Sequence, residues 1–275
     1  MNIKKQYLYD NDRQIWRIIP AGNRVIIEER SSENKEVFFN CIDIISGDEI
    51  FSDIQLNEKF WVGIEAVEDD FIFFHKFPKP DLPNHKSIIT LDLNSSSVLW
   101  ENDELTYFFY FDGKVVCYKQ LFEKRDYFLL NAATGEVISE LGDDHEKVME
   151  LREESIEDYF AEGYLFPVEF RKNVIPETDH EKYLYGYSQK NIIRGNISYI
   201  VVDGLLLFNY HEITEENLFN NTFIAVNLDS EKVLMKETLN KKINNLMPDS
   251  FFVRDDLLFL LFEKTKFGVY SITNQ

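Results

Sequence analysis

Short apolar runs alternate with turn residues along the whole chain. A two-residue turn of Asp, Gly, Asn or Glu, followed by a run rich in branched and aromatic residues, occurs six times. These turns are Gly22-Asn23, Asp69-Asp70, Asp112-Gly113, Glu162-Gly163, Asp203-Gly204 and Asp255-Asp256. Another apolar run precedes most of them, so each turn is expected to join the strands of a hairpin.

A second turn follows each hairpin, at its own offset. Its copies span Asp43–Phe51, Asp92–Trp100, Asn131–Ser139 and Asn227–Met235, with a degenerate copy at Tyr185–Ile193. Asp, Asn, Ser, Thr and Gly favour tight turns by bonding their own backbone or by tolerating positive φ. Each copy therefore predicts a second hairpin.

Two hairpins in a period of about 40 to 50 residues make one four-stranded sheet, the size of a propeller blade. The repeat predicts an all-β fold, a six-bladed β-propeller of four-stranded antiparallel blades, in a single domain over residues 1–275. The expected blades are approximately 17–51, 58–100, 105–139, 157–193, 197–235 and 249–273 plus 8–16. An ordinary β-sandwich also alternates strands and turns, but the near-constant spacing favours the propeller.

The two ends of the chain are expected to complete one blade together. Phe267–Thr273 has no strand after it, whereas Asp12–Trp16 at the N-terminus lacks a partner and ends like Val98-Leu99-Trp100. We expect Ile15 and Trp16 to pair beside Val269–Ile272. The N-terminal strand would then close the ring and leave no long edge open for aggregation.

Asp144–Asp158 departs from the repeat. Val148, Leu151 and Ile156 lie among charged residues at spacings that suit a helix. The segment is either a lid or docking helix over one face, or a solvated connection between the third and fourth blades.

The Asn131-Ala132-Ala133-Thr134-Gly135-Glu136-Val137 turn, and more loosely the turns at Asp43 and Asp92, resemble the blade repeat of quinoprotein (pyrroloquinoline quinone-like) propellers. The consensus of that family has an Asp, a Thr-Gly turn and a terminal Trp at these offsets. The chain also resembles bacterial propeller families whose function is not established. The resemblance implies a fold rather than an activity. Quinoprotein enzymes have eight blades, a ring of adjacent cysteines, Ca²⁺ ligands and a catalytic Asp, but Cys41 and Cys117 are far apart in this sequence.

Net charge, hydrophobic runs and cysteine content indicate which partners and which cellular location to expect. The net charge is -20, which repels phosphate backbones and anionic lipids, so nucleic acid and membrane surfaces are not expected partners. No run approaches the ~20 apolar residues of a membrane span, and no signal-peptide pattern opens the chain. Two cysteines in apolar runs indicate buried thiols. These features predict a monomeric cytoplasmic protein without a cofactor or metal.

Candidate binding residues lie on the loops between the second and third strands of the blades. The long loops are Lys76–Lys86, Arg171–Glu181 and His211–Asn221, and long loops on a rigid scaffold commonly carry binding sites. The candidate partner face consists of Lys76, Lys79, His85, Lys86, Arg171, Lys172, His180 and His211. Its basic residues suit an acidic partner, although isolated lysines also simply solvate a loop. His75 lies beside these loops, and surface or capping histidines are more common than metal ligands where short ligand spacings are lacking.

No nucleophile elbow, phosphate loop, zincin helix or dinucleotide motif occurs in the sequence. The paired carboxylates Asp69-Asp70 and Asp255-Asp256 are explained by their turns. The first hypothesis is a non-enzymatic binding platform for a protein or small molecule, using the long-loop face and the mouth of the channel. The second is a hydrolase or lyase with acidic residues at an axial pocket, and the third is a purely structural scaffold. Clustered buried carboxylates or histidines would favour the enzyme.

Overall fold

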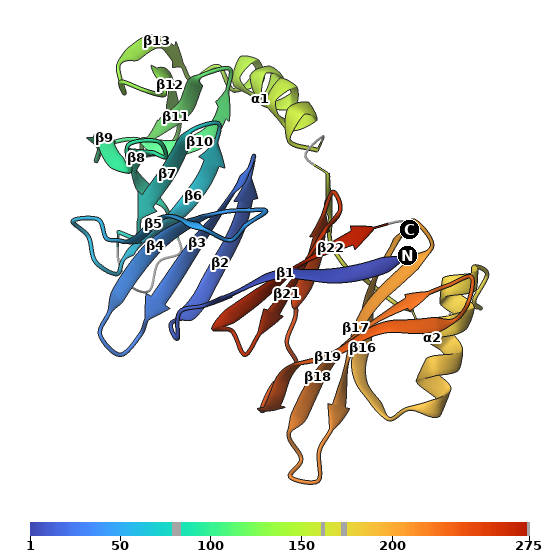
Figure 1. The fold of residues 1–275 in the computed structure, drawn as a ribbon. Helices are drawn as coiled ribbons and strands as arrows, with labels where there is room; N and C mark the ends of the chain where they lie inside the picture. Colours follow the sequence, from blue (N-terminus) through green and yellow to red (C-terminus); the bar gives the residue numbers. More distant parts are fainter. Residues whose placement is uncertain (79–83, 161–162, 172–174, 274–275) are drawn as a thin grey trace. The chain divides into compact units, whose positions relative to one another are not determined.

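The computed structural model describes residues 1–78, 84–160, 163–171 and 175–273 (Figure 1). It divides into two compact units: unit 1 is Met1–Asp12 with Gly163–Gln275, and unit 2 is Arg13–Glu162. Antiparallel strands dominate both units, which confirms the all-β expectation. Neither described helix is long and apolar enough to cross a bilayer. The single-domain assignment stays a prediction.

Unit 2 contains three four-stranded antiparallel sheets. The first sheet is built from β2 (Gln14–Ala21), β3 (Arg24–Ser31), β4 (Glu36–Asp43) and β5 (Glu49–Ile54). The second sheet is built from β6 (Val62–Glu68), β7 (Phe71–Lys76), β8 (Lys86–Asp92) and β9 (Ser97–Asn102). The third sheet is built from β10 (Thr106–Phe111), β11 (Lys114–Gln120), β12 (Arg125–Asn131) and β13 (Val137–Gly142). A single parallel pair, Thr106 with Ser87, links the second and third sheets.

Unit 1 contains two further sheets. The fourth sheet is built from β16 (Ile193–Val202), β17 (Leu205–Ile213), β18 (Phe219–Asn227) and β19 (Lys232–Ile243), with the short β15 (Val168–Glu169) added to β16. The fifth sheet is built from β20 (Phe251–Arg254), β21 (Leu257–Phe262) and β22 (Lys266–Thr273), with β1 (Asn2–Asp10) on β22 and β14 (Tyr164–Leu165) on β20.

The hairpin turns explain why the repeat is so visible in the sequence. Five of the six expected first turns join neighbouring antiparallel strands, and Asp69, Asp112, Asp203 and Asp255 all have positive φ. Two-residue hairpin turns require this backbone region because its twist matches that of the strands. The four clear second turns also form hairpins, β4–β5, β8–β9, β12–β13 and β18–β19. Glu162 of the remaining first turn lies outside the described residues.

The N-terminal strand pairs with the last strand, but the pairing residues differ from those expected. Tyr7 lies opposite Val269 in the β1–β22 ladder. Ile15 and Trp16 instead belong to β2, where Ile15 pairs with Glu29 of β3 and Trp16 lies at a bulge, so their predicted place beside Val269–Ile272 is wrong. The left-handed backbone at Asp12 (φ 58°) ends β1 before they are reached.

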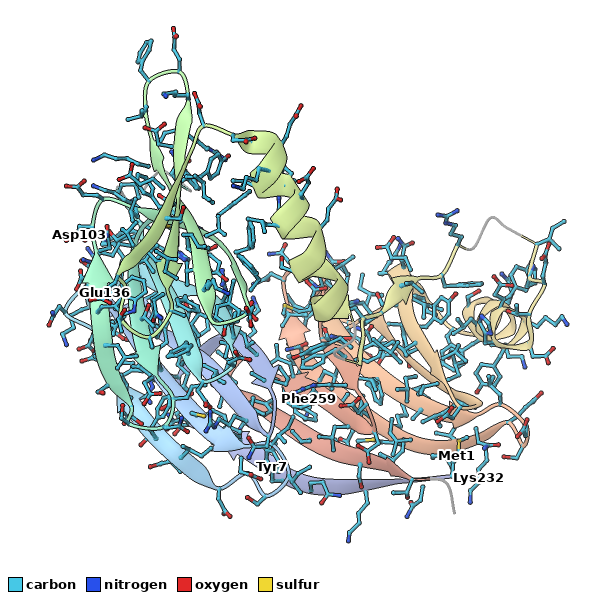
Figure 2. All side chains as sticks on the ribbon, turned by 90° about the horizontal axis from the view of Figure 1, so that it is seen from above. Met1, Tyr7, Asp103, Glu136, Lys232 and Phe259 are labelled. Atoms are coloured by element: carbon cyan, nitrogen blue, oxygen red, sulfur yellow. The ribbon has the colours of Figure 1, made fainter. Side chains whose placement is uncertain are left out.

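Aromatic packing holds β1 on the fifth sheet. The rings of Tyr9 and Phe267 stack with centroids 5.1 Å apart, and Tyr7 meets Phe267 edge-on. Phe259 on β21 continues this aromatic row, with its centroid 6.4 Å from that of Phe267 (Figure 2). The ion pair of Lys266 with Asp10 closes the end of the ladder.

The expected fourth blade, residues 157–193, does not form a four-stranded sheet in the part of the chain that is described. Tyr185–Ile193, expected as a hairpin, lies mostly in helix α2 (Asp179–Lys190), so that prediction is wrong. Thr178 caps the helix: its hydroxyl accepts from the Glu181 amide, and the Glu181 carboxylate accepts from the Thr178 amide. This capping box, together with Leu184 buried on the inner face, favours a helix over a tight turn.

Replacing Thr178 with alanine is expected to lower the stability of unit 1 by about 1 kcal/mol, because the first turn of α2 loses its side-chain acceptor. Thermal unfolding followed by circular dichroism measures the change. Thr178→Ser keeps the acceptor and should remain within about 0.5 kcal/mol of the parent chain. An equal loss in both variants would mean that the hydroxyl does not act as a cap.

The helical spacing in Asp144–Asp158 corresponds to helix α1 (His145–Phe160). Val148 is fully buried in a cluster with Phe109, Val116 and Tyr127 of the third sheet. The segment is therefore a helix packed on a sheet and is more than a solvated connection.

Candidate functional site

Glu65 lies at an irregularity of β6 that turns it out of the regular ladder. Ile64 pairs with Phe74 and Ala66 with Phe73, so Glu65 is the extra residue of a β-bulge. Bulges redirect side chains and are over-represented beside functional sites. The bulge by itself does not mark a site, because it belongs to the repeat: β10 has the same irregularity between Tyr107 and Phe109.

What differs between the second and third sheets is the chemistry at these matching positions. Glu65 lies four residues before the first turn residue of its hairpin, and Phe108 lies four residues before the matching turn residue in the third sheet. His75 lies six residues after the first turn residue, Asp69. Tyr118 lies six residues after the matching Asp112 in the third sheet. Phe108 and Tyr118 form an aromatic contact, with ring centroids 6.1 Å apart. The repeat therefore accommodates an aromatic pair where the second sheet has a carboxylate and an imidazole.

Charged residues of the first sheet fix the backbone on either side of Glu65. The buried carboxylate of Glu28 accepts a hydrogen bond of 3.2 Å from the Ile64 amide, and the Arg17 guanidinium donates to the Ile64 carbonyl. Arg30 pairs with Glu28 at 2.6 Å and donates to the Val62 carbonyl at 2.7 Å. The position of Glu65 is thus set by an ionic clamp between β3 and β6.

Glu65, His75 and His85 form one cluster. Glu65 Oε2 lies 2.7 Å from His75 Nδ1 and 2.6 Å from His85 Nδ1, and one ligand atom from each residue lies within 4.8 Å of the others. The two imidazole rings stack with centroids 3.5 Å apart, and Phe77 meets both edge-on. His75 is 1% exposed, whereas His85 is partly exposed just before β8. We call these three residues the histidine–glutamate cluster.

The cluster leaves His75 without a well-formed hydrogen bond. Its 2.7 Å contact with Glu65 lacks hydrogen-bond geometry, and neither ring nitrogen of His75 has a hydrogen-bond partner among the described residues. Gly63 contributes space on the other side, because a Cβ there would come within 3.3 Å of His75 Nε2. Buried polar nitrogens normally have partners, so an unpaired imidazole needs an explanation.

Burial and mutual contact shift the pKa values of Glu65 and His75. Burial lowers the pKa of His75, and its contact with Glu65 only partly offsets this effect. Burial acts to raise the pKa of Glu65, but the contacts with His75 and His85 outweigh burial and hold that pKa below its usual range. Glu65 is therefore ionised and His75 neutral.

The second feature of unit 2 is a groove of ≈ 720 Å³ between β6, β10 and α1. Its aromatic lining comes from the run Tyr107–Phe111, its acidic lining includes Glu65, Glu68 and Asp69, and Arg152 contributes from α1. Glu65 therefore belongs both to the groove and to the histidine–glutamate cluster.

Acidic side chains line the groove, and one cationic side chain, that of Arg152, lies in it. Burial raises the pKa of Tyr107, and the charges of Glu68 and Glu65 raise it further. The guanidinium of Arg152 lies over the ring of Phe108, 4.9 Å from its centroid. This cation–π contact is a favourable interaction between a guanidinium and the aromatic lining.

The predicted partner residues of unit 2 lie at one end of the second sheet. Lys76 and Lys86 pair in the β7–β8 ladder, and His85, directly before Lys86, is part of the histidine–glutamate cluster. Lys76 is engaged in ion pairs with Glu101 and Asp103. Lys79 lies outside the described residues.

The predicted partner residues of unit 1 are more dispersed. Arg171 is exposed, His180 is partly exposed in the first turn of α2, and Lys172 lies outside the described residues. The expected loop His211–Asn221 is mostly strand, because His211 pairs with Asn221 in the β17–β18 ladder, so that loop prediction is wrong. His211 is buried and accepts a hydrogen bond of 2.9 Å from the Met247 amide. The partner face as a whole stays a prediction.

Sequence reasoning looked for metal ligands at short spacings and across blades, and so missed the histidine–glutamate cluster. Its histidines lie at the two ends of one loop, and Glu65 comes from the neighbouring strand. A usable signal was present: Glu65 and His75 replace the aromatic pair that the next repeat has at the same offsets.

Comparison with known families gives one match. A family model described as "Domain of unknown function (DUF4905)" matches residues 20–100, a segment that contains the whole histidine–glutamate cluster. No curated protein matches the chain. The comparisons therefore name no activity.

Several solved structures are similar over most of the chain. The quinohemoprotein alcohol dehydrogenase ADHIIG from Pseudomonas putida HK5 is 12% identical with a TM-score of 0.32, covering 99% of this chain and 44% of the enzyme. A europium-containing methanol dehydrogenase is 13% identical with a TM-score of 0.32, covering 96% of this chain and 52% of the enzyme. The β-propeller domain of the trilobed protease from Pyrococcus furiosus is 12% identical with a TM-score of 0.34, covering 95% of this chain and 70% of that domain.

This chain spans about half the length of those two dehydrogenases. The strand order does not confirm the count of six blades. At these TM-scores the similarity transfers neither a blade arrangement nor an activity to this chain.

Proposed function

We propose that the protein is a non-enzymatic, ligand-binding β-propeller, and that the groove between β6, β10 and α1 binds a cationic group of its ligand. The observation that carries this proposal is the contact of Arg152 with Phe108 inside an acidic groove of ≈ 720 Å³. A guanidinium or ammonium group from a protein or small molecule would occupy the same kind of position.

The propeller itself is part of the proposal. The four-stranded sheets are the size of blades, and each of the first three begins with a strand that contains a bulge. In a six-bladed arrangement, β14 and β15 would be the remnants of the sixth sheet, since they extend β20 and β16 instead of pairing with each other. We also propose that β1 closes the ring of blades. The protein is further proposed to be monomeric and cytoplasmic.

Binding fits the groove better than hydrolysis by paired carboxylates. Asp69 accepts a hydrogen bond from the Tyr110 hydroxyl, and Asp112 pairs with Lys114 at 2.6 Å. Both carboxylates lie exposed at hairpin turns, where neither is in the desolvated environment that a general acid requires. The histidine–glutamate cluster is the one observation that favours the alternative of a hydrolase or lyase, because it is buried and borders the groove.

Arginine amide is the simplest probe of the groove. Titrated into the isotope-labelled chain, it should shift the NMR signals of Tyr107–Phe111 in a saturable way. Arg152→Met removes the internal cation and should strengthen binding about two- to five-fold, which corresponds to an exposed cation–π contact of ~0.5–1 kcal/mol. Lys147→Met, on the exposed side of the same helix, should leave the affinity unchanged.

Two further results decide the proposal. Glu68→Gln combined with Asp69→Asn should weaken binding about five-fold, because two negative charges near the cation are lost. Acetate should produce no saturable shift. If arginine amide fails to saturate with Arg152→Met, or if acetate binds as well, the groove is not a cation-binding site.

A further inference from the structure

The second sheet holds three side chains of metal-binding chemistry at contact distance. Two imidazoles and one carboxylate are ligands that zinc and neighbouring transition metals accept, and three protein ligands leave one position open. The cluster is built from a bulge residue, a buried strand residue and the residue just before β8. We propose that Glu65, His75 and His85 bind a single divalent transition-metal ion of the zinc type.

The first argument is the unpaired state of His75. It is almost completely buried, and neither ring nitrogen has a hydrogen-bond partner in the part of the chain that is described. A metal bound at Nδ1 takes the place of the proton that faces Glu65 at 2.7 Å, and the imidazole proton then resides on Nε2. Metal ligation supplies the partner that this nitrogen lacks.

The second argument is that the fold does not demand these side chains. The third sheet has the same bulge and hairpin with Phe108 and Tyr118 at the matching offsets. An aromatic pair would satisfy this position without placing a carboxylate and an imidazole in a largely buried site. Replacing it by Glu65 and His75 incurs a desolvation cost, which a bound cation would offset.

The third argument concerns charge and rigidity. Glu65 supplies one negative charge, and the neighbouring Arg30 is already paired with Glu28 at 2.6 Å. Hydrogen bonds from Glu28 and Arg17 to the backbone of Ile64 fix the strand beside Glu65. Two of the three ligands therefore come from fixed strand positions, as a selective site requires.

Metal binding requires one movement. A metal lies in the plane of each imidazole that ligates it, whereas the rings of His75 and His85 are parallel within 4° and stacked. His85 must therefore turn away from the stack. It is free to do so as a partly exposed residue outside the strands, while His75 stays fixed in β7.

The test uses the purified full chain, stripped with a chelator, and Co²⁺ followed by Zn²⁺ as probes. Co²⁺ should give visible d–d absorption typical of nitrogen and oxygen ligation, and Zn²⁺ should displace it with one ion per chain by calorimetry. His85→Ala and Glu65→Gln should each weaken Zn²⁺ binding about 100-fold or more, beyond the 10–100-fold effect of outer residues around a metal. Mg²⁺ and Ca²⁺ should not compete, because both prefer all-oxygen sites.

His180→Ala is the matched control, because this histidine is partly exposed in the first turn of α2 and lies outside the cluster. It should bind Zn²⁺ as the parent chain does. Circular dichroism checks that each variant is folded, and His85 is chosen over His75 because its truncation leaves no buried cavity. If Zn²⁺ binds the parent chain no more tightly than it binds His85→Ala or Glu65→Gln, the cluster is a structural contact and the proposal is wrong. This test is independent of arginine amide, so the groove and the metal site fail or succeed separately.

Discussion

Replacing Glu28 with alanine is expected to lower the free energy of unfolding of unit 2 by about 3–5 kcal/mol, the cost of removing one partner from a buried ion pair. Glu28 is fully buried and carries the charge opposite Arg30, whose side chain is 10% exposed. Its other oxygen accepts the Ile64 amide, so the substitution leaves both a guanidinium and a backbone donor without their acceptor. Urea denaturation followed by circular dichroism measures the loss.

Two companion variants separate charge from packing. Glu28→Gln keeps an acceptor for the Ile64 amide but loses the charge, and should fall between the parent chain and Glu28→Ala. Glu33→Ala removes an exposed carboxylate from the turn between β3 and β4 and should change stability by less than about 0.5 kcal/mol. A Glu28→Ala variant as stable as Glu33→Ala would contradict the clamp between β3 and β6.

Replacing Asn221 with alanine is expected to lower the free energy of unfolding of unit 1 by about 3 kcal/mol, within the range for buried groups left without partners. Asn221 is fully buried and accepts from Asn209 at 2.8 Å. It donates to Asn240 at 3.1 Å and to the Ser250 hydroxyl at 2.7 Å. One side chain thereby ties β17, β18 and β19 to the segment before β20.

Asn196→Ala is the control for this network. Its amide donates to Glu169 at 2.9 Å, but both side chains are exposed, so water replaces the lost bond. We expect a change of less than about 1 kcal/mol in the same urea denaturation. If Asn221→Ala and Asn196→Ala were equally stable, the buried amide network would contribute nothing specific to unit 1.

The sequence predicted the hairpins well because their turns depend on local chemistry. The backbone has positive φ at Asp69, Asp112, Asp203 and Asp255, a conformation that Asp, Asn and Gly tolerate. Where two local signals competed, the prediction failed. Tyr185–Ile193 contains turn-forming residues, but the capping box at Thr178 and the buried Leu184 stabilise a helix there.

The candidate site was predicted only in part. The loop Lys76–Lys86 was identified as a binding segment, and His85 was assigned to it. Its relation to Glu65 depends on the bulge in β6 and on strand pairing, which place residues ten and twenty positions apart in contact. A one-residue change of register would send Glu65 to the opposite face, so spacing alone did not reveal the cluster.

The sequence by itself determined that this protein is made of short antiparallel hairpins, because turn chemistry and alternating apolar residues act within a few positions of each other. It also determined that the N-terminal residues pair with the final strand, though not which residues do so. Only the tertiary structure decided that β1 ends at Asp10, that α2 replaces a hairpin, and that Glu65 meets two histidines. Those outcomes depend on register, capping and desolvation between residues far apart along the chain, and no local pattern encodes them.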